Sequence, residues 1–319
     1  MIKNVSRFFG PLLGITLLLI AFFMLYHKLS MFSIARLKQG LLSVPRERIA
    51  ETALLTACYY WLVTGYDTLA FRFIRHPLPY RRIALAAFTG YAFSHNVGMT
   101  MLSSGSVRYR IHSSFGLTAT ETAKVIAFSV LSYWIGCLTV SSVIFLLLPL
   151  RIPHVLHFPF HTVRILGITS LSLLITYGCL TLGSKAISNI GNVQLPKLRP
   201  TIFVLQMLLG SLDWILASGI LFLLLPQAQL IGFPHFFEIF VLAQIAGLLS
   251  QVPGGIGVFE SILLLLLPSG FPVSVTIGIV LLYRLIFYIV PLMVATALLL
   301  THEVRLAKRK ISSFKCSMH

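Results

Sequence analysis

Charged residues are scarce in this chain. Of its 319 residues, 10% are charged and 57% are hydrophobic, whereas an average soluble domain carries about 25% charged residues. A chain so poor in charge cannot keep a whole molecular surface in water. The composition therefore excludes an ordinary soluble domain and predicts a protein whose outer face is solvated by lipid.

Several chemistry-bearing patterns are also missing. The four cysteines form no C-x-x-C pair and read as small hydrophobic residues, and there is no G-x-x-x-x-G-K-[ST] loop, H-E-x-x-H motif or dinucleotide fingerprint. Three histidines, His154, His157 and His161, lie close together, but no neighbouring Asp, Glu or Cys completes a metal site. We therefore expect no metal, no cofactor and no enzymatic activity, and a membrane-embedded glycosyl or acyl transferase is disfavoured.

Acidic residues are rare beside basic ones, with 25 Lys and Arg against 8 Asp and Glu and a net charge of +17. No nucleic-acid-binding motif accompanies this charge, so nucleic acid is not an expected partner. The basic residues mostly cluster between apolar segments, as the positive-inside rule describes. Residues 71–82, 183–200 and 301–319 hold such clusters, and residues 226–235 hold none.

Apolar runs long enough to span a bilayer need about 20 residues. Candidate segments lie at 8–27, 49–70, 83–103, 119–149, 162–182, 201–225, 236–252, 256–268 and 273–300. The first has basic residues before it but no small-x-small cleavage site after it, so it reads as an uncleaved span. The whole chain, 1–319, is then one polytopic membrane domain that ends in a basic tail at 301–319.

Two of these segments are interrupted. The 83–103 segment runs into a Ser- and Gly-rich stretch around Gly105, and the 236–252 segment runs into Pro253, Gly254, Gly255 and Gly257. Non-helical backbone is tolerated at membrane depth only where it is buried in protein or lines a water-filled cavity. These residues therefore predict the turns of two re-entrant or broken helical hairpins.

With two hairpins, the loop charges predict an all-α membrane protein with about six full spans and both termini in the cytoplasm. The 28–48 stretch disagrees, because it is basic yet falls outside; the spacing of Ile34, Leu37 and Leu41 suggests an amphipathic helix on the membrane surface. The order of spans and hairpins also repeats between residues 1–161 and 162–300 with opposite orientation. Such inverted repeats are the layout of many transporters, with the site between the repeats.

Six ionisable residues fall within or beside the apolar segments, where charge costs at least ~2.5–3.5 kcal/mol. They are Asp67, Arg108, Arg110, Asp213, Glu260 and Arg284. One interpretation is a structural ion pair between Asp213 and Arg284; the other is that the arginines bind a lipid phosphate in bidentate fashion. For Arg108 and Arg110, ordinary flanking charge at a membrane edge is the alternative to phosphate binding.

Two glutamates also read as helix caps. Thr118 and Glu121 form a capping-box pattern, so Glu121 is expected to be a cap. Glu260 lies near the start of the helix after the second break, where it fits either a cap or a contact with a headgroup or proton.

Two motifs resemble those of a known family. Residues 90–98 read GYAFSHNVG and are followed by GSVRYR at 105–110; residues 250–260 read SQVPGGIGVFE and are followed by YRLIFY at 283–288. The pattern is similar to the lysylphosphatidylglycerol synthase transmembrane family, which includes the flippase domain of MprF and stand-alone YbhN-type inner-membrane proteins. The likeness extends over about residues 49–300, and His95 departs from it because MprF-like members commonly carry Asn there.

The resemblance implies a bacterial inner-membrane protein that translocates or handles phospholipid, including aminoacyl-phospholipid, without an aminoacyltransferase domain. Arg108, Arg110 and Arg284 would bind the lipid phosphate, and Asp67, Asp213, Glu260 and Asn96 would supply countercharge or polar contacts. The alternative is an accessory membrane subunit that recruits a lipid- or envelope-modifying enzyme through its basic loops. Membrane phospholipid is the expected partner in the first case, and a homo-oligomer is compatible with either.

Overall fold

The computed structural model describes most of the chain from residue 42 onward. The described residues are 42, 44–97, 100–148, 150, 162–182, 189–190, 193–194, 198–226, 228–250, 252–268 and 270–316. The expected first span at 8–27, most of the 28–48 stretch and the histidines of the 150–161 loop lie outside them.

Long helices form the frame of the protein. They are α3 (Arg46–Ile74), α6 (Ala119–Leu147), α7 (Arg164–Leu182), α8 (Pro200–Leu224) and the continuous run of α11 (Val273–Arg284), η4 (Leu285–Ile289) and α12 (Val290–Cys316). Among the described residues, α6, α7, α8 and the stretch Val273–Lys308 are long and apolar enough to cross a membrane. The prediction of an all-α integral membrane protein is confirmed.

Two shorter helix pairs fold back on themselves. The first hairpin consists of α4 (Tyr80–Val97) and α5 (Thr100–Ser114), and the second of α9 (Phe233–Leu249), the short helix η3 (Pro253–Gly255) and α10 (Val258–Leu266). The two arms of each hairpin pack against one another, and η3 also contacts α4. The two hairpins therefore meet in the molecule. A further short helix, η2 (Ala228–Leu230), and a two-residue pairing of β1 (Asn189–Ile190) with β2 (Val193–Gln194) complete the described elements.

The position of the first turn was predicted wrongly. Gly105 lies inside α5, and its backbone does not adopt positive φ, so the break comes earlier, between Val97 and Thr100. A glycine is tolerated within a helix when packing holds that helix in place, and α5 packs against both α4 and α6.

The second turn lies where the sequence placed it. Gly254, Gly255 and Gly257 have φ of 65°, 61° and 86°, a region that residues with a Cβ rarely adopt.

The capping box before α6 is confirmed. The Thr118 hydroxyl accepts a hydrogen bond from the Glu121 backbone N–H at 3.2 Å, and the Glu121 carboxylate accepts one from the Thr118 backbone N–H at 2.9 Å. Glu121 therefore starts the helix rather than taking part in a site.

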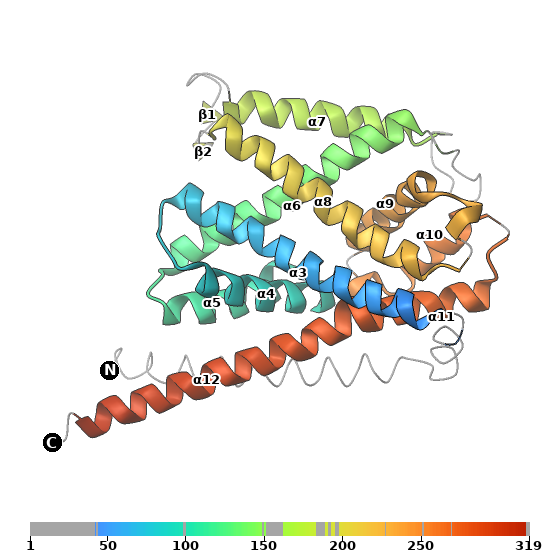
Figure 1. The fold of residues 1–319 in the computed structure, drawn as a ribbon. Helices are drawn as coiled ribbons and strands as arrows, with labels where there is room; N and C mark the ends of the chain where they lie inside the picture. The colour runs from blue at the N-terminus through green and yellow to red at the C-terminus, as the bar shows by residue number, and fades with distance from the viewer. Residues whose placement is uncertain are drawn as a thin grey trace.

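Helix α6 packs against helices that come before it and after it in the sequence. It packs against α7, α8 and α3, and Figure 1 shows α7 along one edge of the molecule and α12 along the opposite edge, with α3, α6 and α8 crossing between them. At the crossing of α6 and α8, Gly136 and Gly210 bring the two backbones together so closely that a Cβ on either would overlap the other glycine. Small residues at such crossings are typical of membrane helices, because close backbone packing drives their association. The inverted-repeat division at residue 161 stays a prediction.

Candidate functional site

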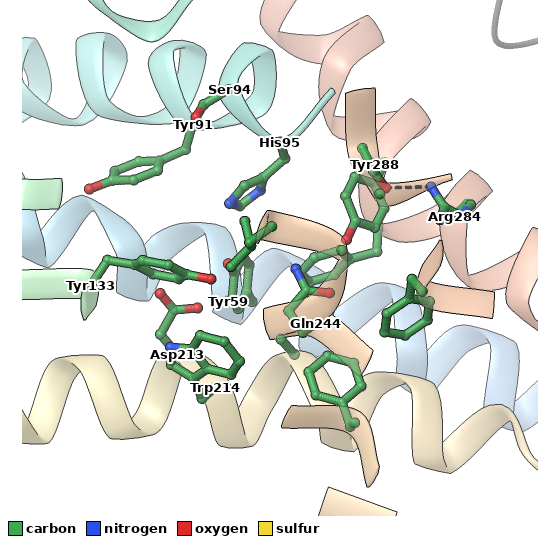
Figure 2. A pocket seen from close by; sticks show the side chains of 18 of the residues that line it. Tyr59, Tyr91, Ser94, His95, Tyr133, Asp213, Trp214, Gln244, Arg284 and Tyr288 are labelled. Atoms are coloured by element: carbon green, nitrogen blue, oxygen red, sulfur yellow. Dashed lines mark hydrogen bonds between the residues drawn. The ribbon is translucent and has the colours of Figure 1, made fainter. Parts of the chain in front are cut away.

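A cavity of about 160 Å³ lies where the two hairpins meet the long helices. Its wall includes three of the predicted charged residues, Arg108 from α5, Asp213 from α8 and Arg284 at the end of α11, together with Gly254 and Gly255 of the second turn. Figure 2 shows Tyr91 and His95 of α4 above the cavity, Asp213 and Trp214 below it, and Arg284 at one side beyond Tyr288. The structure thus brings residues from both hairpins to one cavity. We call it the central cavity.

Arg108 is held by Asp67 of α3. The guanidinium Nη2 lies 3.2 Å from the Asp67 Oδ1, and the side chains are 1% and 0% exposed. The Ser129 hydroxyl donates a hydrogen bond to the same Asp67 oxygen at 2.8 Å, and the guanidinium carbon lies 4.4 Å from the centre of the Tyr91 ring. Gly90 makes room for this arrangement, since a Cβ there would come within 2.5 Å of the Arg108 Nε. The charge of Arg108 is therefore neutralised by Asp67, and its side chain is held in place in the cavity wall.

Arg284 is held in a similar way by Glu260. Its Nε donates to the Glu260 Oε1 at 2.6 Å, and its Nη1 donates to the Gly254 carbonyl at 3.0 Å. The other Glu260 oxygen accepts a hydrogen bond from the Gly257 backbone N–H at 2.7 Å. Glu260 is thus both the cap of α10 and the countercharge of Arg284. The pair ties the Gly-rich turn to α11.

The predicted ion pair between Asp213 and Arg284 is wrong, because Arg284 is taken by Glu260. Asp213 is 3% exposed, and its Oδ2 accepts a hydrogen bond from the Tyr66 hydroxyl at 2.8 Å. Among the described residues, no Lys, Arg or His forms a salt bridge with it. Asp213 is therefore a buried carboxylate at the wall of the central cavity, held by a neutral donor.

Arg110 and Asn96 do not line the cavity, and the same holds for Asp67, Gly105, Pro253, Gly257 and Glu260. Arg110 forms a two-point ion pair with Glu303 of α12, with its Nε 2.7 Å from the carboxylate. Arg110 is therefore engaged with α12 and does not join Arg108 and Arg284 at the cavity. The Asn96 amide donates to the Ala92 carbonyl at 2.8 Å and to the Tyr288 carbonyl at 3.2 Å. Tyr288 belongs to η4, a π-helical turn, and wide turns of this kind leave carbonyls short of helical partners. Asn96 therefore joins the first hairpin to that turn.

Aromatic side chains form much of the wall, and the sequence analysis did not select them. They are Tyr59, Tyr91, Tyr133, Trp134, Trp214, Phe240, Phe259, Tyr283, Phe287 and Tyr288. Tyr133 and Trp214 stack with ring centres 5.4 Å apart, and Trp214 is 2% exposed. One available signal was spacing, because Tyr59, Val63, Tyr66 and Asp67 fall on one face of a helix. Without knowledge of the facing helices, that face reads simply as core.

The described residues hold no group of three or more His, Cys, Asp or Glu side chains that could bind a metal. The loop with His154, His157 and His161 lies outside the described residues, and the absence of a metal site stays a prediction.

Comparison with known proteins finds relatives among membrane proteins. No protein-family model matches the chain. It is 40% identical over 249 residues to an uncharacterized protein of Synechocystis, covering 78% of this chain and 77% of that one. It is 29% identical over 246 residues to the inner membrane protein YbhN of Escherichia coli, covering 76% of each. A shorter match, 36% over 105 residues, relates 32% of this chain to 12% of a phosphatidylglycerol lysyltransferase of Staphylococcus haemolyticus.

Proposed function

Because this chain belongs to the YbhN-type family of membrane proteins, which also shares sequence with phosphatidylglycerol lysyltransferases, we propose that it binds and translocates phospholipid in a bacterial inner membrane. The observation that carries the proposal is the central cavity. It lies between two helical hairpins of a membrane-embedded fold and has Arg108, Asp213 and Arg284 in its wall.

Buried charge supports a binding role for this cavity. Each ionisable group at bilayer depth costs several kcal/mol unless it is paired or meets water or ligand. Two arginines, two partner carboxylates and Asp213 lie in or directly behind the lining of this cavity. A protein that needed only packing would fill this space with apolar side chains. A polar pocket in an apolar fold suits a ligand whose polar part must cross the bilayer.

The size of the cavity indicates how a lipid would be bound. A cavity of about 150 Å³ accommodates a benzene-sized molecule, and the central cavity has about the same volume, 160 Å³. It is large enough for part of a headgroup and far too small for acyl chains. In the proposed mechanism the headgroup passes through the cavity while the chains stay in the surrounding lipid, where no protein surface is needed to solvate them.

Filling the cavity tests the proposal. Ala217 lies in the cavity wall, and Ala217→Leu adds three carbons there. We expect the rate of fluorescent-phospholipid movement between leaflets of proteoliposomes to fall by roughly tenfold or more, equivalent to about 1.4 kcal/mol of barrier. The matched control is Ala297→Leu, the same substitution at an exposed position of α12, which should leave the rate within about twofold of wild type.

Equal rates for Ala217→Leu and Ala297→Leu would remove the cavity from the transport path. A folded wild-type protein that moves no lipid at all would instead favour the accessory-subunit function, in which the basic loops recruit a lipid-modifying enzyme.

The proposal includes an orientation with both termini in the cytoplasm. The last turn of α3, the α3–α4 connection and the end of α12 are basic, with Arg72, Arg75 and Arg305 among their residues, and residues 226–235 contain no Lys or Arg. Cytoplasmic loops of membrane proteins carry the excess of basic residues.

Cysteine labelling checks this orientation. We expect a variant whose only cysteine is Cys316 to resist a membrane-impermeant maleimide in intact cells and to react after permeabilisation. In a cysteine-free background, Gln229→Cys at an exposed position of the 226–235 loop should react in intact cells. The reverse pattern would contradict the orientation.

A further inference from the structure

The charges at the central cavity do not balance. Arg108 is neutralised by Asp67 and Arg284 by Glu260. Asp213 is left over: it is 3% exposed, it lines the cavity, and no described basic side chain forms a salt bridge with it. With Asp213 ionised, the described wall therefore carries one excess negative charge inside an apolar fold. An unpaired buried carboxylate is costly, and a cationic ligand is what would compensate it.

Aromatic rings surround this carboxylate. Tyr59, Tyr133 and Trp214 gather around Asp213 (Figure 2). Ring faces attract cations through their quadrupole, and cages of such rings are a known means of binding ammonium groups. The protein's own cations already use this interaction in the same wall, since Arg108 lies over Tyr91 at 4.4 Å and Arg284 faces Tyr288 at 5.8 Å. The rings beside Asp213 have no such described cation.

Size then limits the ligand. At 160 Å³, the cavity suits a group of about benzene size. An ethanolamine group, with two carbons and one nitrogen, fits this space, whereas a lysyl-glycerol group is several times larger. The ligand class suggested by charge, rings and volume is therefore a small ammonium group attached to a phosphate, of which ethanolamine is the smallest common example.

We infer that the central cavity recognises the ammonium of an ethanolamine-type phospholipid headgroup, held by Asp213 and the rings of Tyr59, Tyr133 and Trp214. The headgroup phosphate then lies toward Arg284, on the opposite side of the cavity (Figure 2). This inference rests on the proposed phospholipid function. It assigns headgroup selectivity to the Asp213 carboxylate rather than to the arginines. It also disfavours aminoacylated phosphatidylglycerol as the ligand.

Direct binding tests the inference without any transport assay. The purified full-length protein in detergent is titrated with short-chain phosphatidylethanolamine, phosphatidylglycerol and lysyl-phosphatidylglycerol carrying identical acyl chains. Binding is followed by tryptophan fluorescence, because Trp214 and Trp134 line the cavity. We expect the ethanolamine lipid to bind at least about tenfold more tightly than either other lipid, a difference of about 1.4 kcal/mol.

Asp213→Asn should weaken binding of the ethanolamine lipid to the level of phosphatidylglycerol. Glu51→Gln, the matched loss of an exposed carboxylate on α3, should leave binding unchanged. Equal or tighter binding of phosphatidylglycerol by the wild type, or unchanged binding by Asp213→Asn, would overturn the inference, and tighter binding of the lysylated lipid would overturn the size argument and the ethanolamine class with it. The wild-type comparison needs no variant and so stands even if Asp213→Asn fails to fold.

The two failures are distinguishable. Selective ethanolamine-lipid binding without lipid movement would refute translocation only. Movement of all lipids alike, with no preference in binding, would refute the headgroup assignment only.

Discussion

Replacing Asp67 with asparagine is expected to lower the free energy of unfolding by about 3–5 kcal/mol, because it leaves the Arg108 guanidinium buried without its countercharge. The two side chains are 0% and 1% exposed, so water cannot take over the lost interaction. The shape of the side chain barely changes, and the asparagine oxygen can still accept the Ser129 hydroxyl hydrogen bond. The loss therefore reports charge rather than packing. Thermal or denaturant unfolding of the protein in detergent micelles measures it.

A double-mutant cycle separates this pair from general damage. Arg108→Gln alone should also destabilise the protein, and the combination of Asp67→Asn with Arg108→Gln should lose less than the sum of the two by a coupling of about 0.5–3 kcal/mol. Glu303→Gln breaks the Arg110 pair, whose side chains are 11% and 15% exposed, and should have a smaller effect. Additive losses of unfolding free energy across the cycle, or equal losses for Glu303→Gln and Asp67→Asn, would contradict the assignment of Asp67 and Arg108 as a buried, coupled pair.

Gly210→Ala is expected to destabilise the protein by about 1–3 kcal/mol, because the added methyl group has no space at the α6–α8 crossing. A Cβ at Gly210 would overlap the Gly136 backbone, and one at Gly136 would overlap Gly210. Backbone atoms cannot move aside as the end of a flexible side chain can, so the helices must separate. The effect outweighs the gain in helix propensity, about 1 kcal/mol for replacing Gly with Ala. Unfolding in detergent provides the measurement.

Gly105→Ala is the matched control. Gly105 also lies inside a helix, and among the described residues a Cβ there would meet only the Ile126 Cδ1 at 3.9 Å, an ordinary contact. Here the gain in helix propensity acts alone, so the variant should be as stable as wild type or slightly more stable. If Gly105→Ala were the more damaging of the two, both the close α6–α8 crossing and the position of Gly105 within α5 would be refuted.

The close α6–α8 crossing matters for the proposed function because it makes one side of the central cavity a rigid frame. Helices α6 and α8 hold Ser129, Tyr133, Asp213 and Trp214 on one side of the central cavity. The two hairpins and η4 form the other side, where polar contacts such as Asn96 to the Tyr288 carbonyl and Arg284 to Glu260 and the Gly254 carbonyl join them. A headgroup that enters or leaves is therefore expected to displace the hairpins rather than the α6–α8 frame.

Much of the fold could be predicted because its causes are local. Apolar runs of spanning length mark the helices. Proline disfavours a continuing helix and the glycines after it permit positive φ, which is why the second break at Gly254 and Gly255 is confirmed. The capping box at Thr118 and Glu121 needs only four consecutive residues. The first break was misplaced because serine and glycine are compatible with both a turn and a packed helix. At Gly105, packing of α5 against its neighbouring helices favours the helical conformation.

By itself, the sequence determined that this is a membrane protein, that its elements are helices, and that two of its apolar segments are interrupted. These features follow from hydropathy and backbone preference, which act over a few residues. Only the tertiary structure decided which charges pair. Asp67 meets Arg108 and Glu260 meets Arg284, while Asp213 keeps Tyr66 as its partner and Arg110 turns to Glu303. A buried charge selects the opposite charge that packing brings within about 4 Å, and that neighbour depends on how whole helices cross.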